Sequence, residues 1–119
     1  MKMKNKDILW LAGLLEGEAG FGTKVCKDKR RAKNKIYVYE TPNIQLHLTD
    51  KDIVKRASKL FLSPLHGPYE PHGSFVAKKQ VYATNITGSK AAGIMMTIYE
   101  LLGKRRQSQI RKIINKWLE

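Results

Sequence analysis

Two acidic residues, Glu16 and Glu18, directly follow an apolar segment at residues 8–15, and Gly17 lies between them. A glycine lets the backbone come close to a ligand, so the carboxylates lie beside a place where a ligand can approach. Mg²⁺ binds oxygen ligands, usually from one or two carboxylates together with substrate phosphates. The segment therefore predicts a divalent-cation site built on Glu18, with a solvated helix end as the competing interpretation.

The charge of the chain indicates what such a site would face. The 119 residues include 23 Lys and Arg against 10 Asp and Glu, a formal net charge of +13. With 42% hydrophobic residues, the chain is expected to fold as one domain over residues 1–119. A folded domain this basic usually binds a polyanion, and an acid next to a polyanion needs a cation between them. A basic surface kept only for solubility is the alternative.

The single cysteine and the lengths of the apolar runs bear on the compartment. Cys26 can form neither an intrachain disulfide nor a zinc site from paired cysteines, which favours a reducing compartment. No apolar run reaches the ~18 residues of a membrane span. Residues 8–15 follow three lysines, as in a signal peptide, but the acids directly after them argue against one. We expect an intracellular protein, cytoplasmic or organellar, with no membrane partner.

The element that positions Glu18 is a helix over residues 8–15, ILWLAGLL, which is apolar on every side. We expect Asp7 or Asn5 at its N-cap and Gly17 at its end. A helix that is apolar all round must be buried all round, and the core of one small chain covers only one side. Ala12 and Gly13 would let a second helix approach closely. A fully buried central helix in a monomer is the alternative.

Two extended segments joined by a basic connection follow this helix. In the second segment the apolar residues hold even positions, as in a strand with one face inward: Ile36, Val38, Ile44, Leu46 and Leu48. In the first segment, Phe21 and Val25 are expected to point inward. The opposite face of the second segment is polar throughout: Lys35, Tyr37, Tyr39, Thr41, Asn43, Gln45 and His47. Seven basic residues lie between positions 24 and 35, next to this polar face.

The rest of the chain predicts a helix, a turn-rich segment with short strands, and two more helices. Thr49 and Asp52 resemble a capping box for a helix that ends before Pro64. Residues 80–87 alternate like a strand, and helices are expected over residues 88–102 and after Gly103. The predicted order is helix, two strands, helix, two strands, helix, helix. Strand pairs joined by loops favour an α+β fold with an antiparallel sheet.

Residues 11–18, LAGLLEGE, resemble the LAGLIDADG motif of homing endonucleases, with Trp10 before and Phe21 after the motif. The predicted element order is similar to the αββαββα fold of that family, with a saddle-shaped antiparallel sheet and C-terminal helices. The segments LTDKDIV and LLGKRRQ also look like family members at the same places. The resemblance covers nearly the whole chain. Ala19 stands where the family usually has Gly directly after the second acid.

The resemblance implies roles for individual residues. Glu18 would bind the catalytic divalent metal, Mg²⁺ with Mn²⁺ as a substitute, together with the backbone carbonyl of Gly17. Glu16 would cap or support the paired helix rather than bind metal. Lys90 is the nearest match to a basic residue that assists catalysis, and Asp50 to a polar residue that holds water. Metal-activated water would then attack a phosphorus atom of the DNA backbone.

The resemblance also implies a homodimer, because proteins of this family with one motif pair and the motif occurs once here. The expected interface residues are Trp10, Leu11, Ala12, Gly13, Leu14 and Glu16. A two-fold dimer reads a palindromic or near-palindromic site. The sheets would lie in the DNA major groove, where base pairs are distinguishable. The expected DNA-binding residues are Lys24, Lys27, Lys29, Arg30, Arg31, Lys33, Lys35, Tyr37, Tyr39, Thr41, Asn43, Gln45, His47 and Asn85, and we expect Lys104, Arg105 and Arg106 to bind phosphates.

The function implied is a site-specific double-strand DNA endonuclease of the kind that confers intron or intein mobility. One alternative keeps the scaffold without the reaction: a DNA- or RNA-binding protein that does not cut, such as an intron maturase or a transcription regulator. RNA is an expected partner only in that case. Glu18 favours the enzyme, whereas Ala19 favours the alternative.

Overall fold

The computed structural model describes residues 3–29, 36–69 and 80–118 and confirms the predicted α+β class and element order. A short 3₁₀ turn between the last two helices is the one addition within these ranges. The elements are α1 (Asn5–Glu18), β1 (Ala19–Lys29), β2 (Ile36–Leu48), α2 (Lys51–Phe61), β3 (His66–Tyr69), β4 (Val81–Thr87), α3 (Gly88–Ile98), η1 (Tyr99–Leu101) and α4 (Lys104–Trp117).

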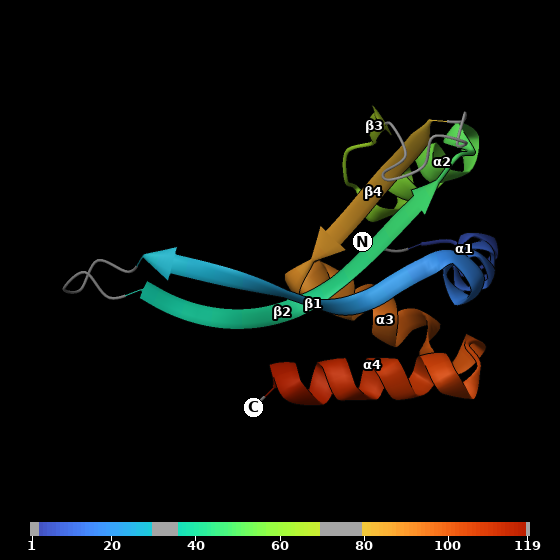
Figure 1. The fold of residues 1–119 in the computed structure, drawn as a ribbon. Coiled ribbons are helices and arrows are strands. Elements are labelled where there is room, and N and C mark those ends of the chain that lie inside the picture. Colours follow the sequence, from blue (N-terminus) through green and yellow to red (C-terminus); the bar gives the residue numbers. More distant parts are fainter. Residues whose placement is uncertain (1–2, 30–35, 70–79, 119) are drawn as a thin grey trace.

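The four strands form one antiparallel sheet in the order β1-β2-β4-β3 (Figure 1). β1 starts directly at the end of α1, with Ala19 opposite Leu46 and Gly20 opposite Gln45. On the other side of β2, Gln45 faces Asn85 of β4. The end of α1 therefore lies close to the C-terminal part of β2, in the middle of the sheet.

The hydrophobic core lies between one face of the sheet and the helices. Ile44 and Leu46 of β2 and Ile86 of β4 are buried there against side chains from all four helices. The helical contributions are Leu11 and Leu15 of α1, Val54, Ala57 and Phe61 of α2, Ile94, Met95 and Ile98 of α3, and Ile110 and Ile113 of α4. The predicted inward direction of the even-numbered residues of β2 is confirmed at these central positions. The opposite face of the sheet is left without helices.

The outer half of the β1–β2 hairpin extends beyond the helices as a two-stranded arm (Figure 1). Val25 and Val38 lie on this arm and are 55% and 62% exposed. The prediction that both are inward-facing core residues is therefore wrong. Their strand positions match the pattern, but both side chains stay largely exposed, although Lys116 near the end of α4 reaches Glu40, the residue paired with Val25, at 2.7 Å.

The helix ends differ from those the sequence predicted. α1 starts after Lys4 and continues through Gly17 to Glu18, so Gly17 does not end it. The N-cap of α2 is Asp50, with no side-chain hydrogen bond, so the predicted capping box at Thr49 is not formed. The helix expected over residues 88–102 is divided into α3 and η1.

Among the described residues, no helix is long and apolar enough to span a bilayer.

Candidate active site and nucleic-acid interface

Glu18 is the last residue of α1, and its side chain is exposed. The next residue, Ala19, is extended (φ −85°, ψ 153°) and buried opposite Leu46. Burial of Ala19 and its pairing with β2 fix the point at which the helix becomes a strand. The position of Glu18 is thus set by the core on one side and the sheet on the other.

The donor groups around Glu18 have the chemistry that suits a hard divalent cation. Within the described residues, no hydrogen bond or ion pair occupies the Glu18 carboxylate. Gly17 lies in the last turn of α1, where backbone carbonyls have no helical partner and the helix end carries partial negative charge. Oxygen donors of this kind fit Mg²⁺, which is usually completed by water and phosphates. The described part of the chain contains no cluster of three His, Cys, Asp or Glu residues.

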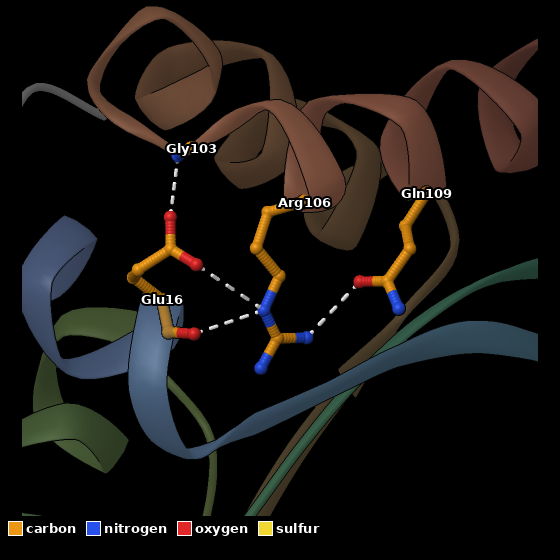
Figure 2. Close-up of polar contacts among 4 residues, drawn as sticks. All are labelled: Glu16, Gly103, Arg106 and Gln109. Atoms are coloured by element: carbon orange, nitrogen blue, oxygen red, sulfur yellow. Dashed lines mark hydrogen bonds and ion pairs between the residues drawn. The ribbon is translucent and has the colours of Figure 1, made fainter.

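Glu16 has a different environment, which Figure 2 shows. Its Oε1 accepts a hydrogen bond from the backbone N–H of Gly103, the N-cap of α4. A glycine cannot cap its own helix with a side chain, and the carboxylate from α1 provides the negative charge that a helix N-terminus favours. Glu16 was expected at the dimer interface. Within one copy the carboxylate supports α4 of the same chain, and its side chain is 38% exposed.

Arg106 lies beside Glu16 and is only 6% exposed. Its Nε donates to the backbone oxygen of Glu16 at 2.9 Å and lies 3.7 Å from Glu16 Oε2, while Nη1 donates to Gln109 at 3.1 Å (Figure 2). Its guanidinium carbon lies 5.0 Å from the centre of the Phe21 ring. Burial lowers the pKa of Arg106, nearby Arg105 lowers it further, and Glu16 acts in the opposite direction. The expectation that Arg106 binds phosphate is wrong, because its guanidinium is enclosed in the protein.

Two residues expected to assist catalysis have other roles in this structure. Lys90 Nζ donates to the backbone oxygen of Leu62 at 3.1 Å, at the left-handed residue that ends α2. This contact connects α3 to α2 instead of bringing Lys90 to Glu18. Asp50 is exposed at the start of α2, two residues beyond β2. No described contact joins either side chain to Glu18, so their proposed catalytic parts have no support from the geometry.

The uncovered face of the sheet carries several of the expected DNA-binding side chains. Gln45 and His47 are exposed and alternate along β2, and Asn85 lies beside Gln45 on β4, partly exposed. Gly20, opposite Gln45 on β1, has no side chain to cover it. Lys24 and Tyr39 are exposed on this face of the arm, whereas Lys27 is paired with Val38 and is exposed on the other face. Amide, imidazole, hydroxyl and ammonium groups on one open surface can hydrogen-bond to base edges and phosphates.

Thr41 and Asn43 depart from the sequence-based prediction. They are 6% and 7% exposed, although their strand positions place them on the polar face. Asn43 pairs with Thr87 at the end of β4, and Thr41 lies next to Gly88, where α3 begins. The β4–α3 junction therefore crowds these two side chains, and they are not open to a ligand. Asn43 Oδ1 has no hydrogen-bond partner in the described structure.

Other expected DNA-binding residues cannot be placed. Arg30, Arg31, Lys33 and Lys35 lie outside the described residues, and so do the side chains of Lys29 and Tyr37.

α1 is only partly open, contrary to the expectation of a broad interface. Leu11 and Ala12 are buried in the core of their own chain, and Leu14 is partly buried against it. Trp10 is covered by Arg56, whose guanidinium carbon lies 4.0 Å from the ring centre. Only Gly13 of the expected interface residues is exposed. Leu9 was not among the expected interface residues, but it is 60% exposed four residues before Gly13 and belongs to the same apolar run.

The fold matches solved structures of homing endonucleases. I-CeuI complexed with DNA has a TM-score of 0.63 and 14% sequence identity, over 97% of this chain and 55% of that chain. I-CvuI with target DNA has a TM-score of 0.64 and 10% identity, over 94% of this chain and 68% of that chain. The archaeal intron-encoded I-Vdi141I complexed with DNA has a TM-score of 0.60 and 11% identity, over 95% of this chain and 69% of that chain. No family model and no curated protein matches the sequence.

These matches confirm the resemblance at the level of the fold. The chain has the LAGLIDADG homing-endonuclease fold. It spans little more than half the length of I-CeuI. At 10–14% identity the likeness establishes architecture, and function has to be argued from the chain's own residues.

Proposed function

We propose that this protein is a site-specific double-strand DNA endonuclease that acts as a homodimer and requires a divalent metal. One observation carries the proposal: Glu18 is exposed at the α1–β1 junction of this fold, with no partner among the described residues. An acid without an internal partner in a chain of charge +13 is available for a cation that also binds DNA phosphates.

Each part of the chain has a distinct task in this proposal. Gln45, His47 and Asn85 on the open sheet face contact base edges, and Lys24 and Lys27 hold the phosphate backbone. Glu18 and the Gly17 carbonyl would hold the metal. The metal, when bound, would supply Lewis-acid chemistry and an activated water. The solved I-CvuI complexes contain DNA in the presence of Mg or Ca, which is consistent with Mg²⁺ or Mn²⁺ here.

A homodimer follows from the need for two reaction centres. One copy offers one Glu18, and cutting both strands at a palindromic site needs one centre per strand. Two copies related by a two-fold axis would bring their α1 helices together and supply both carboxylates.

The alternative is a DNA- or RNA-binding protein on the same scaffold that does not cut. The contact of Lys90 with Leu62 favours it, because no described basic side chain is seen to accompany Glu18. Ala19, where the family usually has Gly, favours it as well.

The deciding experiment selects a bound site from a library of double-stranded DNA and incubates that site with the protein. We expect cleavage of both strands in Mg²⁺ or Mn²⁺ and none in EDTA. Glu18→Gln should keep DNA affinity and lose cleavage by at least about a hundredfold, since the loss of a group that only supports a metal ligand already costs about 10- to 100-fold.

Asp52→Asn is the matched control, because it removes an exposed acid from the start of α2. It should cut like the wild type. Tight binding of one site without any cleavage in either metal would reject the nuclease and leave the non-cleaving alternative.

A further inference from the structure

Arg106 is a buried charged residue that the proposed function does not use. It belongs to the first turn of α4, and burial of a cation is costly unless the surroundings compensate for it. Its partners are a backbone carbonyl, a carboxylate, an amide and an aromatic face. Because the enclosed guanidinium makes four contacts, it is held in one position.

Two of these contacts lie on either side of the candidate metal site. Arg106 donates to the backbone oxygen of Glu16 at 2.9 Å, and its guanidinium carbon lies 5.0 Å from the Phe21 ring centre. Gly17 and Glu18 lie between these two residues in the chain. One side chain of α4 thus holds the last turn of α1 and the start of β1 together.

The second connection between α1 and α4 works in the same direction. Glu16 Oε1 accepts from the N–H of Gly103, and a Cβ at position 103 would come within 3.2 Å of that oxygen. The charge of Glu16 is therefore occupied by α4 and by Arg106 at 3.7 Å. Of the two acids in the motif-like segment, only Glu18 is left for a cation.

We propose that Arg106 is a positioning residue: by binding Glu16 and Phe21, it holds the Gly17 carbonyl and the Glu18 carboxylate in one arrangement for a divalent cation. This inference rests on the proposed function. Arginine suits the task better than lysine, because its planar group donates in fixed directions and stacks on a ring at the same time. Arg106→Lys retains the charge and loses this geometry.

The test compares Arg106→Lys with Arg56→Lys. Arg56 also places a guanidinium over an aromatic ring, that of Trp10, and bonds a carboxylate, that of Asp7 at 3.3 Å, but nearer the other end of α1. Mn²⁺ is titrated into each protein–DNA complex, and the bound metal is followed by electron paramagnetic resonance. The Mn²⁺ bound by the Glu18→Gln complex is subtracted, and the remainder is the Mn²⁺ binding that depends on Glu18.

Arg106→Lys should raise the Mn²⁺ concentration at half-saturation, the midpoint of the titration, about 10- to 100-fold, the range measured when a group that supports a metal ligand is removed. Its DNA affinity in EDTA should stay within about twofold of the wild type. Arg56→Lys should leave the midpoint unchanged. If Arg106→Lys does not fold, Phe21→Leu removes the ring alone and should give a smaller rise. An unchanged midpoint in the folded variant, or an equal rise in Arg56→Lys, overturns the proposal.

A second readout separates failure of this proposal from failure of the proposed function. If the wild type neither cuts DNA nor binds Mn²⁺ through Glu18, the nuclease proposal fails, and hydrogen exchange then decides whether Arg106 orders the segment. Arg106→Lys should speed exchange of the Glu18 and Ala19 amides at least about tenfold, because both amides lie in or cap the last turn of α1. Exchange equal to that of Arg56→Lys overturns the positioning role.

Discussion

Glu16 and Glu18 are two residues apart and have opposite surroundings. Glu16 caps α4 and lies near a buried guanidinium, whereas Glu18 is exposed at the junction with β1. The resemblance to the LAGLIDADG motif separated a supporting acid from a metal-binding one, and the structure identifies α4 of the same chain as what Glu16 supports. The sequence could not reveal Arg106, because its partner Glu16 lies 90 residues away and no local pattern marks the pair.

Gly103 offers a test of this contact at the scale of one residue. Its φ of −72° is open to any residue, but a Cβ would come within 3.2 Å of Glu16 Oε1. Gly103→Ala should therefore displace the carboxylate and weaken the cap, lowering the free energy of unfolding by about 1 kcal/mol in urea denaturation.

The control for Gly103→Ala is Gly93→Ala, which adds a methyl to an exposed helical site with nothing within 4 Å. That change should stabilise the protein by up to about 1 kcal/mol. Equal effects of the two substitutions would contradict the claim that Glu16 needs the space at residue 103.

At the scale of elements, the sequence predicted which way a strand residue faces but not whether anything covers it. Alternation assigned Ile44 and Leu46 to the helix side, and both are fully buried. The same alternation placed Val38 inward and Thr41 outward, yet Val38 is exposed and Thr41 is buried. Whether a strand residue is buried depends on how far the helices extend over the sheet and on the path of the β4–α3 junction. Both are set by tertiary packing, which a period-two pattern does not contain.

Substitutions on the arm and in the centre of β2 test whether cover by the helices decides how much an apolar strand residue contributes to stability. Val25→Thr together with Val38→Thr should change the free energy of unfolding by less than about 1 kcal/mol, because both side chains are already exposed. Ile44→Ala, in the fully buried part of β2, should cost about 2–5 kcal/mol. Urea denaturation of the two variants measures both values. If the double valine variant were as unstable as Ile44→Ala, the two valines would have to be counted as core residues.

At the scale of the whole molecule, element order carried more information than residue identity. The chain keeps the fold of I-CeuI at 14% identity, because alternating strands and apolar helix faces can be built from many sequences. Order and periodicity predicted the α+β class and the antiparallel sheet, whereas the particular fold was predicted from the resemblance of residues 11–18 to the LAGLIDADG motif. The surface left for a second copy was not predictable in the same way, since it depends on which side of α1 the other helices cover.

The open stripe of α1 consists of Leu9, Gly13 and Gly17, spaced four residues apart and all exposed. In a two-fold dimer through this stripe the same patch of both copies is buried, so Leu9→Glu would place two carboxylates in one apolar contact. We expect the dimer to dissociate at least about a hundredfold more readily, with the monomer fold intact because Leu9 is outside the core. Sedimentation velocity over a range of concentrations measures the dissociation of the dimer.

Leu118→Glu is the control, since Leu118 is 71% exposed near the C-terminus, away from α1 (Figure 1). A dimer that survives Leu9→Glu and separates with Leu118→Glu would place the contact on α4 instead.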